Sequence, residues 1–153
     1  MIAANQESNG DIVLTTHAFN ITESRRLLVI DDQPGITRVV KLIANEMGIE
    51  TEGVNLPARA LDMFLSFRPD IVMIDMIMPE MDGIEILNEI LLTGCQPHVI
   101  LMTGFGEGYL RLAEALTRFH DHERYSMLRK PFRREELADE LNRCAFTARH
   151  LSY

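Results

Sequence analysis

The chain has 153 residues, enough for one domain with its own hydrophobic core. Its 15 Lys and Arg residues against 23 Asp and Glu residues give a net charge of −8, the wrong sign for a protein that binds nucleic acid through the phosphate backbone. The 2 cysteines are too few for a disulfide framework, and the absence of a bilayer-length apolar run and of a secretory signal favours a single acidic domain in the cytoplasm.

From residue 25 onward, the chain alternates short apolar runs with amphipathic segments. The apolar or alternating runs predict strands over 27–31, 49–55, 70–75, 98–104 and 125–130. Apolar residues three and four positions apart predict helices over 34–48, 60–67, 83–94, 109–119 and 133–146. This order favours an α/β fold, with a parallel sheet covered by helices on both faces.

Three segments are expected along the chain. Residues 1–24 combine polar residues with one short apolar run, DIVLTTHAF, and are predicted to form a flexible arm with a short strand at residues 12–14. The regular pattern over 25–146 predicts the folded domain, and residues 147–153 form a short tail.

Side chains that can bind a metal ion or take part in catalysis lie where four of the predicted strands end. Asp31 and Asp32 follow the first strand, Asp75 the third, Thr103 the fourth and Lys130 the fifth. In an open α/β sheet these ends meet at one edge, where ligands bind. Hard carboxylate oxygens suit Mg²⁺ better than zinc, and beside a divalent ion one carboxylate can attack phosphorus. The lysine and the threonine would then neutralise and hydrogen-bond the transferred phosphoryl oxygens.

Each of these residues also has a structural interpretation. Asp31 and Asp32 could cap the helix that begins near Pro34, Thr103 could be an ordinary strand-end hydroxyl, and Lys130 could be a solvated surface charge. The chain has 2 lysines against 13 arginines, so an ammonium group at this position favours the functional interpretation.

Four motifs carry a family resemblance: VIDD (29–32), MIDMIMPEMDG (73–83), MTG (102–104) and LRKPF (128–132). With these motifs in this order, residues 25–146 resemble the receiver domain of bacterial two-component response regulators. The resemblance implies a doubly wound, flavodoxin-like sheet of strand order 2-1-3-4-5. It also implies that a sensor histidine kinase or phosphotransfer protein supplies a phosphoryl group.

The resemblance assigns roles to individual residues. Asp75 is the expected phosphoacceptor, and Asp32 and Asp75 are the expected direct ligands of Mg²⁺. Asp31 would hold a water of that ion, and the main-chain carbonyl of Ile77 would be a further ligand. Thr103 and Lys130, matched by the other two motifs, would assist phosphoryl transfer.

Two features depart from the usual receiver pattern. Receivers usually have an aromatic residue three positions before the lysine, where this chain has Met127; Tyr125 shares that strand face by alternation. Ile77 and Phe105 occupy the positions that flank the approach of a hydrolytic water in receivers. Both are large and apolar, so the phosphoryl group is expected to be lost slowly.

The resemblance predicts a phosphorylation-dependent signalling switch rather than a turnover enzyme, with no direct contact to nucleic acid or membrane. The face of the fourth helix, fifth strand and fifth helix is the expected surface for a downstream effector or a homodimer. Seven residues follow Phe146, too few for an output domain. Two alternatives remain open: a phosphorylation-independent interaction module, and the excised receiver of a longer protein with an output domain such as a cyclic-di-nucleotide phosphodiesterase.

Overall fold

The computed structural model describes residues 25–104, 106 and 124–150. The predicted arm (1–24), the helix predicted over 109–119 and the end of the tail (151–153) lie outside these residues. Within the described ranges, no helix combines the length and the apolar character that crossing a membrane requires.

Five parallel strands form one sheet in the order β2-β1-β3-β4-β5. The three central strands are apolar and almost entirely buried, as expected when helices cover both faces of a parallel sheet. This order confirms the predicted doubly wound fold. The strands are β1 (Arg26–Ile30), β2 (Glu50–Val54), β3 (Ile71–Asp75), β4 (His98–Thr103) and β5 (Tyr125–Arg129).

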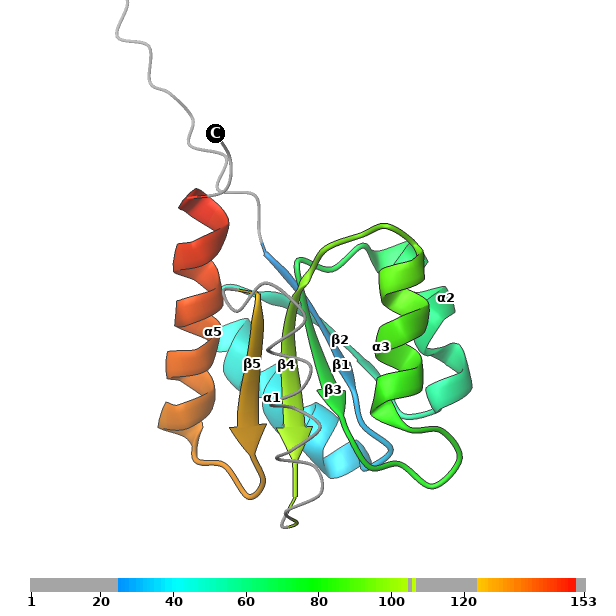
Figure 1. The fold of residues 1–153 in the computed structure, drawn as a ribbon. Helices are drawn as coiled ribbons and strands as arrows, with labels where there is room; N and C mark the ends of the chain where they lie inside the picture. The colour runs from blue at the N-terminus through cyan, green and yellow to red at the C-terminus, as the bar shows by residue number, and fades with distance from the viewer. Residues whose placement is uncertain (1–24, 105, 107–123, 151–153) are drawn as a thin grey trace, which may run out of the picture.

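Helices lie on both sides of the sheet, with α1 and α5 on one face and α2 and α3 on the other (Figure 1). The buried apolar residues of these helices face the strands. The helices are α1 (Pro34–Glu46), the short 3₁₀ helix η1 (Pro57–Arg59), α2 (Ala60–Phe67), α3 (Gly83–Leu92) and α5 (Arg134–His150).

Alternation along the strands divides the apolar residues between two cores. In β1, Leu28 belongs to the core under α2 and α3, whereas Leu27 belongs to the core under α1 and α5. Tyr125 and Met127 of β5 belong to the first of these cores, which confirms that they share a face. Because the strand interiors are packed on both sides, polar chemistry is confined to their ends.

The elements differ from the predictions mainly at their ends. The last helix continues to His150, four residues beyond the predicted end at 146, because neither Gly nor Pro interrupts residues 147–150. The second helix spans the predicted residues, since α2 starts at Ala60, and Pro57 begins the short helix η1 that precedes it. The Arg59 N–H donates to the Leu56 carbonyl at 2.9 Å, which closes this tighter turn.

Candidate functional site

Three carboxylates meet at the carboxyl edge of the sheet. Asp31 and Asp32 directly follow β1, and Asp75 is the last residue of β3, the neighbouring strand. One oxygen of each carboxylate lies within 4.8 Å of the corresponding oxygen of the other two. Asp31 and Asp75 are buried, and Asp32 is partly exposed. Three of the residues predicted from strand ends therefore form one acidic cluster.

Lys130 places its ammonium group against this cluster. Its Nζ lies 2.6 Å from Asp31 Oδ2 and 3.0 Å from Asp75 Oδ2, and its side chain is 15% exposed. The interpretation of Lys130 as a solvated surface charge is therefore wrong. Burial disfavours the ammonium, but the hydrogen bonds to the two carboxylates outweigh it and raise the pKa of Lys130.

Opposing influences act on Asp75. Burial raises the pKa of Asp75 and outweighs its hydrogen bonds from Lys130 and from the Ile77 N–H, while the Asp31 charge raises the pKa further. The Ile77 N–H donates to Asp75 Oδ1 at 3.2 Å. One ammonium thus faces two buried carboxylates and a third beside them, which leaves an excess of negative charge.

The donor set fits a divalent cation with hard-ligand chemistry. Within the described residues, the cluster offers three carboxylates, and the partial exposure of Asp32 leaves space for water molecules, as Mg²⁺ prefers. A hollow of about 160 Å³ borders Asp32. Its other lining residues are Asn55, Leu56, Pro57, Pro79 and Glu80.

The loop that carries Asp31 and Asp32 is held by hydrogen bonds. The Asp31 N–H donates to the Val54 carbonyl at 3.1 Å, and Asp31 Oδ1 accepts from the Gln33 N–H at 2.9 Å. Gln33, not either aspartate, is the N-cap residue of α1, so the helix-cap interpretation of the Asp pair is wrong. The buried carboxylate of Asp31 instead points to Lys130.

Asn55 is a positioning residue that the sequence analysis missed. It directly follows β2, and its Nδ2 donates to the Asp31 carbonyl at 2.8 Å and to Thr37 Oγ1 at 3.1 Å. The strand-end criterion that selected the aspartates would also have found it, because it is the polar residue after the second strand.

Gly83 brings α3 close to the end of β3. A Cβ at this position would lie 2.3 Å from the Asp75 carbonyl oxygen and 2.9 Å from Met76 Cα. The preceding residue, Asp82, is the N-cap of α3, and its Oδ1 accepts from the Ile84 N–H at 3.0 Å. Because Gly83 has no side chain, the first turn of α3 can pack directly against the end of β3 at Asp75.

The remaining predicted residues lie around the cluster. Thr103 is the buried last residue of β4, and its carbonyl accepts from the Lys130 N–H at 2.7 Å. Ile77 is 49% exposed beside Asp75. The roles of the Thr103 hydroxyl and the Ile77 carbonyl stay predictions, and Phe105 lies outside the described residues.

Comparisons with known proteins give a consistent result. Residues 27–142 match the family model of the response regulator receiver domain. The chain is 38% identical over 84 residues to sporulation initiation phosphotransferase F of Bacillus subtilis (strain 168), covering 55% of this chain and 68% of that protein. It is 37% identical over 87 residues to the regulatory protein AtoC of Escherichia coli (strain K12), covering 57% of this chain.

A solved structure agrees with these sequence matches. The response regulator receiver domain protein from Clostridium thermocellum superposes with a TM-score of 0.72 at 28% identity, over 83% of this chain and 98% of that one. The relatives themselves differ in length, since the match to AtoC spans only 19% of that protein.

Proposed function

The chain belongs to the response regulator receiver domain family, and from this premise we propose that it is a phosphorylation-dependent signalling switch. Asp75 would accept a phosphoryl group from a sensor histidine kinase or phosphotransfer protein in the presence of Mg²⁺. The observation that supports this proposal most is the contact of Lys130 Nζ with both Asp31 and Asp75 inside a cluster of three carboxylates.

In the proposed reaction, a carboxylate oxygen of Asp75 attacks the phosphorus of a phosphohistidine. A phosphorus–oxygen bond forms, the phosphorus–nitrogen bond breaks, and the electron pair returns to the histidine of the partner. Lys130, already 3.0 Å from Asp75, would neutralise charge on the phosphoryl oxygens. The hydroxyl of Thr103, at the end of the adjacent strand, would hydrogen-bond one of these oxygens.

The same cluster would hold the metal ion. Asp32 and Asp75 would bind Mg²⁺ directly, Asp31 through a water molecule, and the main-chain carbonyl of Ile77 would complete the protein ligands. When bound, Mg²⁺ supplies positive charge that stabilises the transferred phosphoryl group. The cluster has three carboxylates and the one contacting ammonium group of Lys130, and this excess of carboxylates supports the proposal that a cation binds there.

The output of the switch is proposed to be a change of surface rather than turnover of a substrate. The face that includes β5 and α5 would contact a downstream effector or a second copy of the chain. Exposed charged residues follow one another at the start of α5, where Arg134 forms an ion pair with Glu46 of α1. We place the protein in the cytoplasm, where sensor kinases present their phosphohistidines.

Incubation with acetyl phosphate and Mg²⁺, followed by intact mass measurement, tests the acceptor. The wild type should gain one phosphoryl group, and Asp75→Asn should gain none, because the amide keeps the shape but removes the nucleophile. Asp62→Asn, a change at an exposed carboxylate of α2, is the matched control and should be phosphorylated like the wild type.

Three outcomes would contradict the proposal. Undiminished labelling of Asp75→Asn would place the acceptor elsewhere. A wild type that gains no phosphoryl group would favour the phosphorylation-independent interaction module. Continuous release of phosphate from small phosphate esters over many turnovers would favour an enzyme.

A further inference from the structure

A larger pocket opens at the opposite, amino edge of the sheet. Its volume is about 530 Å³, within the range typical of small-molecule sites. The pocket lies between the end of α2, the start of β3, the segment before β4 and the residue before β5. Asp70 lies at this edge, five residues before Asp75, so the strand separates it from the acidic cluster by about 16 Å.

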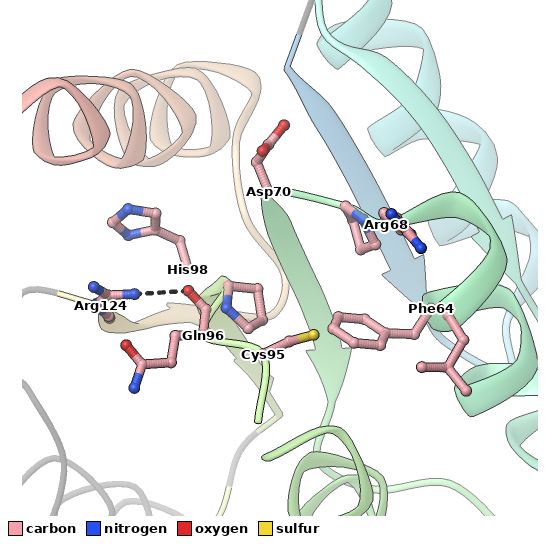
Figure 2. A pocket seen from close by; sticks show the side chains of 10 residues that line it. Phe64, Arg68, Asp70, Cys95, Gln96, His98 and Arg124 are labelled. Atoms are coloured by element: carbon pink, nitrogen blue, oxygen red, sulfur yellow. Dashed lines mark hydrogen bonds between the residues drawn. The ribbon is translucent and has the colours of Figure 1, made fainter. Parts of the chain in front are cut away.

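The walls of the pocket combine apolar surface with basic side chains. Phe64 and Leu65 of α2 and two prolines contribute apolar surface. Figure 2 shows Phe64 and Arg68 on one side of the pocket, and His98 and Arg124 on the other, with Cys95 drawn between them. Two guanidinium groups therefore line the pocket, and Nη1 of Arg124 also donates to the Gln96 carbonyl at 2.7 Å.

The carboxylate in the pocket wall is already bound. Asp70 Oδ2 accepts from the main-chain N–H of Arg26, the first residue of β1, at 2.9 Å. No ion pair or hydrogen bond joins the guanidinium of Arg68 to any other residue in the described part of the chain. Among the described residues that line the pocket, basic side chains outnumber carboxylates, in a protein whose net charge is −8.

Arg68 occupies a backbone conformation that favours glycine. It ends α2 with φ 51° and ψ 63°, and it is the one non-glycine residue with positive φ within the described ranges. Glycine or asparagine is usual at such a position because other side chains are strained there. In this conformation the Arg68 N–H donates to the Phe64 carbonyl at 2.9 Å and closes α2, and the Arg68 side chain lines the pocket.

His98 adds a buried polar group to the same pocket. It is 7% exposed, and no hydrogen bond links its imidazole to another described residue. Burial lowers the pKa of His98, and the charges of Arg124, Arg143 and Arg25 lower it further, whereas the charge of Asp70 raises it. Among the described groups that shift the pKa of this imidazole, three are guanidinium groups and one is a carboxylate.

From this arrangement we infer that the pocket binds an organic anion, a small molecule with a carboxylate or phosphate group on an apolar body. The anionic group lies near the guanidinium groups of Arg68 and Arg124, and the apolar body packs on Phe64 and Leu65. This site is separate from the proposed phosphoacceptor, and its occupancy does not depend on phosphorylation.

The two cysteines allow a direct measurement. Cys95 is exposed and lines the pocket, whereas Cys144 is 4% exposed, and burial raises its pKa to about 11, so that it stays an unreactive thiol. An aryl disulfide that reacts with Cys95 forms a mixed disulfide and releases one aryl thiolate, which is followed by absorbance. The anionic reagent is dithiobisnitrobenzoate, and the neutral reagent is dithiodipyridine.

The rate constant for the anionic reagent, divided by that for the neutral reagent, reports binding of the anion. A change in the reactivity of the thiol itself alters both rate constants and cancels in this ratio. Arg68→Gly and Arg124→Gln should each lower this ratio about threefold or more, the effect of one charge a few ångströms away in solvent. The glycine variant should also retain the fold, because its backbone conformation is relaxed. Arg133→Gln, an equal change of charge at the carboxyl edge, should leave the ratio unchanged.

Competition distinguishes a bound anion from general electrostatic attraction. Benzoate and phenyl phosphate should slow the anionic reagent in a saturable manner, and the more effective of the two identifies the carboxylate or the phosphate class. Benzyl alcohol, of similar shape but neutral, should protect less. Asp75→Asn should behave like the wild type, which separates this result from any failure of the phosphoacceptor proposal.

An unchanged ratio in both arginine variants would overturn the inference. So would the absence of saturable protection by either anion, or equal protection by benzyl alcohol.

Discussion

The two edges of the sheet carry opposite charge. At the carboxyl edge, three carboxylates lie close together, and the ammonium group of Lys130 contacts two of them, Asp31 and Asp75. At the amino edge, two guanidinium groups and a buried imidazole line a pocket with one carboxylate, which already accepts a main-chain hydrogen bond. The same parallel strands join the two edges, and their interiors are apolar because helices cover both faces. A parallel sheet can therefore keep two oppositely charged sites apart without a second domain.

The two edges also differ in how their ionisable side chains are accommodated beside the apolar core. At the carboxyl edge, the ammonium group of Lys130 contacts Asp31 and Asp75 directly, so the arrangement depends on close geometry. At the amino edge, burial lowers the pKa of His98, so the imidazole is neutral at neutral pH. The acidic cluster at the carboxyl edge favours binding of a cation, and the basic pocket at the amino edge favours binding of an anion.

The largest effect is expected where the carboxyl edge is most closely packed. Gly83→Ala places a Cβ 2.3 Å from the Asp75 carbonyl oxygen, so the start of α3 must move. We expect the free energy of unfolding, measured in urea, to fall by about 2–3 kcal/mol. Gly35→Ala is the control, since nothing lies within 4 Å of its Cβ. Equal stability of the two variants would show that α3 is not constrained by this contact.

Removal of one carboxylate tests the excess of negative charge at the carboxyl edge. Asp32→Ala should weaken Mg²⁺ binding by about tenfold or more, because few protein ligands are available to hold the ion. Calorimetric titration with Mg²⁺ measures the change, and Asp62→Ala, which removes an exposed carboxylate in α2, is the control. Equal affinity in Asp32→Ala and the wild type would exclude Asp32 as a ligand.

The amino edge should show its own dependence on pH. Because the pKa of His98 is lowered on folding, the unfolded chain takes up this proton first as the pH falls below about 6.5, and stability is lost. His98→Gln should remove this contribution, which is at most about 1.4 kcal/mol per pH unit for one proton. Arg25, Arg124, Arg143 and Asp70 surround the imidazole and are unchanged in the variant.

Urea unfolding of both proteins between about pH 7 and pH 5 measures this difference in slope. The two proteins should show parallel curves above about pH 7, where the imidazole is neutral in both states. Identical slopes below that pH would contradict the buried, neutral state of His98.

The smallest expected effect concerns the lifetime of the phosphoryl group at the carboxyl edge. Ile77 is 49% exposed beside Asp75, and it offers an attacking water no hydrogen bond. Ile77→Asn should speed the loss of the phosphoryl group by about threefold or more, because the amide can orient this water. A time course of intact mass after removal of acetyl phosphate follows the loss. Leu42→Asn, a similar change on α1 at a residue 61% exposed, should have no effect.

Wild-type protein that loses its phosphoryl group within seconds, with no partner present, would contradict the predicted slow hydrolysis. An unchanged rate in Ile77→Asn would show that this residue does not limit the approach of water.

The sequence by itself determined the five strands and one edge of the sheet. The apolar runs and helical spacings predicted five strands close to those observed, with the main differences at helix ends. Asp31, Asp75 and Lys130 were found because parallel strands bring their carboxyl ends to one edge, whatever the details of packing. Local periodicity is enough for this inference because each strand end can be recognised without knowing its neighbours.

Only the tertiary structure decided which side chains touch. The contact between Lys130 and Asp31 joins residues 99 positions apart, and Asn55 reaches Asp31 from an adjacent strand. The amino-edge pocket brings Arg68, His98 and Arg124 together from three separate segments, with no motif to mark them. Strand order and register place these groups, and both depend on how the two cores pack between distant parts of the chain.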